Sequence, residues 1–150
     1  MTPRRTILNA LETALKTIPN AEVVANPVDD IRAKPKPVLA LHDGEDSPAD
    51  APQNAHLGPL RRKRLSQPVV EMYASGRAGD VRDTLDRLYE AVVAVVLTDP
   101  ALRQAVGAVG GGIDIGDFTP AHAAGTQIQG AASLTLEISY TIDPTKLLRS

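Results

Sequence analysis

Side chains that could do chemistry are few and scattered in this sequence. His42 precedes a small acidic group, which consists of Asp43, Glu45 and Asp46. Carboxylate oxygens could hold a hard cation, but this group lacks the remaining ligand positions and the terminal bidentate Glu of a calcium loop. The three histidines are single and widely spaced, and none lies on a predicted helix with Glu or Asp at metal-ligand spacing. We therefore predict a solvated turn and loop histidines here, and no metal site.

Signals for covalent catalysis or cofactor binding are also missing from the sequence. The chain has no cysteine, which excludes disulfides, thiolate metal sites and cysteine nucleophiles. No serine has a Gly-x-Ser-x-Gly context. The glycine-rich segment 107–112 has no following Gly-Lys-Ser/Thr and leads into a strand, so it predicts a turn or bulge rather than a phosphate-binding loop. We predict no catalytic residue and no cofactor, although distant residues can converge in a folded chain.

One run of basic residues stands out: Arg61, Arg62, Lys63 and Arg64. The formal net charge of −2 excludes a generally basic protein that coats nucleic acid, so any DNA contact must be local. The run is compatible with a solvated stretch, with contacts to phosphates, or with contacts to an acidic protein surface. With one Phe, three Tyr and no Trp, stacking on single strands is poorly supported.

Apolar periodicity predicts two main amphipathic helices. The first runs from about Pro3 to Thr17, with Thr2 as its N-cap, and the second runs from Asp80 to Thr98. A short helical turn is expected around Ala101 to Val106. The longest apolar run, Ala91 to Leu97, is too short to span a bilayer.

Four strands are predicted from β-branched and alternating residues. They are Val38 to Leu41, Gln67 to Tyr73, a glycine-led strand over residues 110–117, and the alternating segment that ends at Ile142. The segment 43–64 holds prolines, glycines and charges with few apolar residues, which predicts an extended loop or arm. Loops of this length are uncommon inside a domain and are often functional.

The fold class that follows is α+β, in a single domain that covers residues 1–150. We expect a four-stranded mixed or antiparallel sheet with the two main helices packed on one face. The long arm would lie between the first two strands, where it could reach a partner.

The order of these elements resembles the tail terminator proteins of long-tailed bacteriophages and gene-transfer particles. The resemblance covers most of the chain and rests on five segments: ILNALETALKTI, ALHDGED, VVEMYASG, VRDTLDRLYEAVVAVVLTDPAL and SLTLEISYTIDP. No single motif is diagnostic, because this family is recognised by pattern rather than by fixed residues.

The resemblance implies a structural, non-enzymatic role in the virion, assembled in the host cytoplasm. Six copies would form a ring on the head-proximal end of the tail tube, stop its growth and offer a surface to the head connector. The expected partners are other copies, the tail tube protein and the connector or head-closure protein, with DNA passing through the lumen without sequence-specific binding.

Specific contacts can be assigned as hypotheses. The run Arg61 to Arg64 would face the lumen or dock on the tube, and His42, Asp43, Glu45 and Asp46 would contact a neighbouring subunit or the tube. The alternatives are another neck or minor tail component, such as a head-closure protein, and a small α+β ligand-binding module, which would require a pocket with convergent polar groups. A DNA-binding regulator is less favoured, because neither helix is basic.

Overall fold

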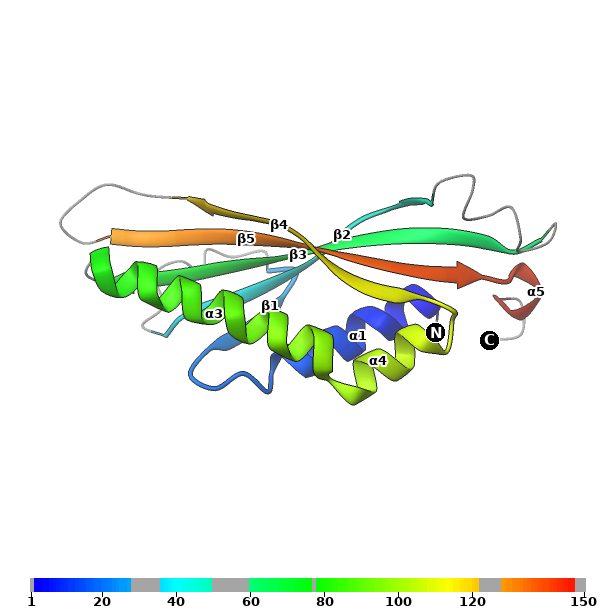
Figure 1. Cartoon of the computed structure of the whole chain (residues 1–150), viewed down its shortest axis with the longest axis horizontal. Coiled ribbons are helices and arrows are strands. Elements are labelled where there is room, and N and C mark those ends of the chain that lie inside the picture. Colours follow the sequence, from blue (N-terminus) through cyan, green and yellow to red (C-terminus); the bar gives the residue numbers. More distant parts are fainter. Residues whose placement is uncertain (1, 28–35, 50–59, 77, 122–127, 148–150) are drawn as a thin grey trace.

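Helices on one side of a twisted sheet form the architecture of the chain (Figure 1). The computed structural model describes residues 2–27, 36–49, 60–76, 78–121 and 128–147. The sheet has five strands in the order β1-β2-β3-β5-β4. Their bounds are Glu22–Ala25 for β1, Val38–Pro48 for β2, Arg62–Gly76 for β3, Gly112–Ala121 for β4 and Ile128–Ile142 for β5.

The helices in the described part of the chain are α1 (Pro3–Leu15), α3 (Ala78–Thr98), α4 (Pro100–Gly107) and the short α5 (Pro144–Leu147). Figure 1 shows α1, α3 and α4 together beneath the sheet, with α3 running along β5 and β3. Thr2 caps α1, as predicted, because its hydroxyl accepts the backbone N–H of Arg5 at 3.2 Å. Asp99 caps α4 in the same way through the N–H of Leu102.

Period-two burial along β5 places the core between the sheet and the helices. Leu134, Leu136 and Ile138 are fully buried, whereas the residues between them are only partly buried. The adjacent rows on β3 and β2 bury Val70, Met72, Leu39 and Leu41 on the same face. This face, called the helix face below, is the buried one that the alternating pattern of the sequence predicts.

The predicted α+β class is confirmed, but the details differ. The sheet has five strands rather than four, because the four-residue β1 pairs parallel with β2. Such a short strand has too few residues to show a period. Three helices rather than two cover the helix face, since the predicted turn at 101–106 is an eight-residue helix.

The predicted arm over residues 43–64 is wrong at both ends. Strand β2 continues to Pro48, with residues 45–48 paired with residues 64–67 of β3, and β3 begins at Arg62, with residues 62–64 paired with residues 140–142 of β5. A register shift between His42 and Glu45 lets β2 pass through the predicted turn as a bulge. The centre of the predicted arm, residues 50–59, lies outside the described residues.

No helix in the described part of the chain is long and apolar enough to cross a membrane.

Candidate functional site

The first turn of α1 carries two arginines that need partners. Arg4 and Arg5 lie at the positive end of the helix dipole, where cations are disfavoured. Oxygen atoms of the β2 bulge compensate for this unfavourable placement of two positive charges. Arg5 donates a hydrogen bond to Asp43 Oδ2 at 2.6 Å, and Arg4 donates to the carbonyl oxygens of Asp43 and Gly44 at 3.4 and 3.0 Å. These contacts fasten the start of α1 to β2.

Asn26, just after β1, completes the contacts of Asp43. Its amide donates to Asp43 Oδ1 at 3.1 Å, and its side-chain oxygen accepts the backbone N–H of Asp43 at 3.0 Å. The hydrogen bond from Arg5 lowers the pKa of Asp43 below its ordinary value, while partial burial acts in the opposite direction. The same contact raises the pKa of Arg5. Asp43 is therefore held in its charged form between three elements.

Asp46 is the centre of a second set of contacts on the helix face. Its side chain is only 14% exposed, and Arg64 donates to its Oδ1 at 2.7 Å. The Tyr140 hydroxyl donates to Oδ2 at 2.5 Å, and Arg4 Nε lies 3.6 Å from the same oxygen. Burial, and then the hydrogen bond to Asp46, raises the pKa of Tyr140 to about 12. Arg4 Nε is buried without a hydrogen-bond partner among the described atoms.

The structure thus brings together three of the predicted site residues, Asp43, Asp46 and Arg64. Their charges are used in contacts within the chain that join α1, β2, β3 and β5. Sequence reasoning missed Arg4, Arg5, Asn26 and Tyr140 as members of this cluster. Two arginines in the first turn of a predicted helix were the available signal, because that position disfavours cations unless carboxylates lie nearby.

The remaining predicted residues lie apart from this cluster. His42 Nε2 lies 3.2 Å from Glu71 Oε1, and the Tyr73 hydroxyl also contacts Glu71. Glu45 is exposed. The basic run does not form one patch, because it enters β3 and its side chains alternate between the two faces.

Within that run, Arg61 and Arg62 are exposed, while Lys63 and Arg64 are partly buried. Arg61 Nε lies 3.6 Å from Asp143 Oδ2. Arg64 already binds Asp46 within the chain. The hypothesis that it contacts the lumen is therefore weaker for Arg64 than for Arg61, Arg62 and Lys63.

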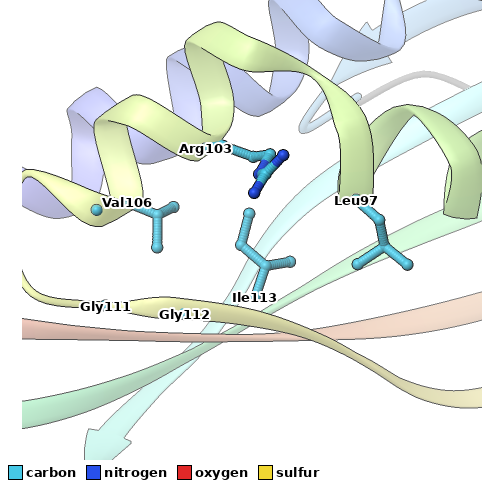
Figure 2. Close-up of a pocket in the computed structure, with 7 residues that line it drawn as sticks. Leu97, Arg103, Val106, Gly111, Gly112 and Ile113 are labelled. Atoms are coloured by element: carbon cyan, nitrogen blue, oxygen red, sulfur yellow. The ribbon is translucent and has the colours of Figure 1, made fainter.

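Two shallow depressions lie elsewhere on the described surface. One, of about 370 Å³, separates α4 from the start of β4. Figure 2 shows Arg103 of α4 reaching into it towards Ile113, with Leu97 at the end of α3 on its rim. The other, of about 400 Å³, crosses the opposite sheet face beside Asp114 and Glu137. Among the described residues no group of three or more His, Cys, Asp or Glu is arranged to hold a metal ion.

The two outer strands of the sheet offer a different kind of site. Strands β1 and β4 each pair on one side only within the described part of the chain. An unpaired strand edge presents backbone donors and acceptors to a partner. The edges differ in length and sequence, so the subunit has two distinct sides.

No protein-family model matches the chain, and no curated protein matches its sequence significantly.

Proposed function

We propose that this chain is a structural virion protein, a tail terminator whose six copies form a ring on the head-proximal end of a phage tail tube. The observation that carries the proposal is the sheet whose two edge strands differ and whose helices, among the described residues, cover one face. A closed ring built by head-to-tail contacts needs two different complementary surfaces on each subunit. The order of elements, which resembles the tail terminator family, gives the ring its proposed place.

The internal use of the charged cluster also favours a structural role. Asp43, Asp46 and Arg64 stabilise the junction of helix and sheet rather than converge on a cavity. The two depressions are shallow, and the one beside α4 has Arg103 as its only charged lining residue among those described. Binding sites for small molecules usually enclose their ligand and combine several polar groups. The proposal involves no catalysis and no cofactor.

The partners follow from the place of the ring. One rim would cover the last ring of tail tube protein and the other would receive the head connector, while DNA would pass through the lumen. Exposed Arg61 and Arg62, with Lys63 beside them, are the side chains proposed to meet DNA or the tube. Six linked contacts would hold the cap firmly even where each contact is weak.

The test is the mass of the purified protein by light scattering, with and without its candidate tail tube protein, followed by electron microscopy of tube lengths. We expect a sixfold mass, alone or on tube ends, and tubes that stop growing when the protein is added. The control is an equal amount of an unrelated protein of similar size and charge. A protein that stays monomeric and leaves tube length unregulated would overturn the proposal.

A ring that ignores tubes and binds the portal side would instead identify a head-closure protein. The same measurement therefore separates the two neck proteins.

A further inference from the structure

We infer that the first half of β4, residues 112–115, is the edge that receives β1 of a second copy, so that neighbouring sheets in the ring join into one. The inference rests on the proposed ring and names the contact that closes it. Its occupant is the β1 segment of the next subunit, with residues 23–26 opposite residues 112–115.

The two halves of β4 differ in how well they could accept another strand. The second half contains the register shift between Ile115 and Phe118, and Pro120, which has no backbone N–H to donate. Bulges and prolines are the usual protection of an exposed edge against pairing. The first half pairs regularly with β5 from Gly112 to Ile115 and lacks these features. Protection is therefore confined to the half that would not be covered.

Strand direction suits the contact. Strand β1 is parallel to β2, and the successive pairs β2 with β3, β3 with β5, and β5 with β4 are all antiparallel. Strand β4 therefore runs opposite to β1. When a second copy is placed edge to edge with its helices on the same side, its β1 meets β4 in the antiparallel orientation. This is the more stable of the two pairing modes.

The apolar faces also match. On β1, Val23 and Ala25 pair with Leu39 and Leu41, so they lie on the helix face. On β4, Ile113 and Ile115 pair with Ile138 and Leu136 and lie on the same face. Ala25 is exposed and the other three are only partly buried in a single copy. Joining the edges would extend the apolar layer of the sheet across the boundary.

The depression beside α4, called the crevice from here on, supports residues 112–115 as the edge that receives β1. Leu97 on its rim is 42% exposed, and Ile113 lies on its floor. Figure 2 shows that the crevice opens over the start of β4. A strand added to residues 112–115 would place its helix-face side chains beside this crevice. The largest exposed apolar side chain of the helix layer would then be close to a partner.

Charge selects one register. Two registers keep the helix faces together: Ile113 opposite Ala25, which extends the contact to Gly116 at the start of the bulge, or Ile113 opposite Val23. The second would put Glu22 directly opposite Asp114, and like charges at directly opposed positions are destabilising. The first puts Glu22 opposite Gly116 and Ile115 opposite Val23. We therefore assign the register in which Ile113 faces Ala25.

The chain has no cysteine, which makes disulfide cross-linking a clean test. Cysteines would replace Ala25 and Ile113 in one chain, and oxidation would be followed on a non-reducing gel. Within one copy these positions lie at opposite edges of five strands, roughly 19 Å apart at 4.8 Å per strand spacing. A disulfide requires Cα atoms within about 7 Å, so any bond must join two copies. We expect a ladder of covalent multimers that ends at the ring.

Matched variants locate the contact. The pair Val23→Cys with Ile113→Cys lies on the same face in the rejected register and should give no ladder. A second pair, Val24→Cys with Asp114→Cys, tests the assigned register on the opposite face and should give one. Because the two pairs change different faces of the sheet, a folding defect in one does not remove the other. Circular dichroism would confirm that each variant is folded.

Each outcome decides something. Ladders from both assigned pairs, with none from the shifted pair, would support the inference. A sixfold mass without ladders from either assigned pair would overturn the inference and leave the ring intact. Dimers from Ile113→Cys alone would show a two-fold contact between β4 edges, which overturns the head-to-tail joint. A monomer at every concentration, with and without tubes, would overturn both proposals.

Discussion

At the scale of single residues, the hydrogen-bonded carboxylates of β2 are the most informative feature of this chain. Asp43 lies in the bulge and Asp46 lies three positions further along β2, and each binds a different arginine of α1. One sequence segment thus fixes the start of the first helix, although nearly forty residues separate the two. Such contacts depend on tertiary structure, so the sequence predicted the charged residues but not their partners.

Tyr140 should make stability sensitive to alkaline pH. Its pKa is raised from 10.0 to about 12, so the folded state favours the neutral phenol. The contribution is therefore complete below pH 10 and is lost as the pH rises towards 12. In Tyr140→Phe this loss should disappear, at a cost of about 1 kcal/mol at neutral pH for the missing hydrogen bond to Asp46. Urea unfolding between pH 8 and 11.5 measures both effects.

Tyr73→Phe is the matched control, because the Tyr73 hydroxyl also contacts a carboxylate, that of Glu71, but the residue is only partly buried. It should keep the alkaline loss of the unchanged protein. An alkaline loss of equal size in Tyr140→Phe would contradict this account.

Asp43 should make the stability of the protein sensitive to acidic pH. Its pKa is lowered by the hydrogen bond from Arg5, so its contribution is complete above the ordinary value of 3.8 and is lost as the pH falls through the lower folded value. Asp43→Asn should cost about 0.5 to 1 kcal/mol at pH 7, since both partners are partly exposed. Once the pH has fallen below that lower folded value, the variant and the unchanged protein should unfold with similar free energies.

Glu12→Gln tests whether any surface ion pair would give the same result. Glu12 pairs with Lys16 one helical turn away at 3.3 Å, and its loss should cost less than that of Asp43. Equal costs at pH 7 would remove the special role of the bulge.

At the scale of secondary-structure elements, the bulge at Gly44 decides the length of β2. The segment His42 to Gly44 resembles a hairpin turn in sequence, because a glycine after an aspartate suits both a turn and a bulge. In the structure Gly44 has φ +69° and the strand continues to Pro48. Neighbouring residues on β3 make the choice, and a single strand sequence does not contain them.

Gly44→Ala should be strongly destabilising. A Cβ at this position would lie 2.0 Å from the backbone oxygen of Gln67, and the positive φ is unfavourable for alanine. We expect a loss of at least about 2 kcal/mol in the free energy of unfolding, typical of a position where backbone strain and a steric clash combine. Chemical denaturation measures it.

The control is Gly79→Ala in the first turn of α3, where a Cβ meets nothing within 4 Å. Alanine favours a helix over glycine, so this change should be neutral or stabilising by up to about 1 kcal/mol. Similar losses at both positions would mean that the bulge is not the special feature.

Periodicity predicted the long elements of this fold well and the short ones poorly. The stripes of α1 and α3 and the alternation in β5 each extend over ten or more residues, so their buried faces could be predicted. Strand β1 has four residues, and the charged ends of β2 and β3 have no apolar alternation to mark them. Those charges are compatible with a strand because Asp46 and Arg64 neutralise each other across the pair.

At the scale of the whole molecule, different members of the basic run 61–64 are expected to serve folding and assembly. Arg64 binds Asp46 inside the chain, whereas Arg61 and Arg62 are exposed and Lys63 is partly buried on the other face from Arg64. Folding and partner contacts can thus be tested with different members of one short run. The proposed ring uses the exposed Arg61 and Arg62, and the bond between the partly buried Arg64 and Asp46 supports the fold.

Replacing Arg61, Arg62 and Lys63 together by serine should cost no more than about 1 kcal/mol in the free energy of unfolding, as surface charges usually do. Arg64→Ser should cost about 1 to 3 kcal/mol, because it removes a charge-assisted bond from the partly buried Asp46.

If the exposed cations meet phosphates in the lumen, the triple variant should bind duplex DNA more weakly. The logarithmic salt slope should then fall by up to about 0.9 for each lost contact. Fluorescence anisotropy of labelled duplex DNA at several salt concentrations measures the slope. An unchanged slope with impaired capping of tubes would assign the run to the tube protein instead, because a contact with protein does not release the counterions of DNA.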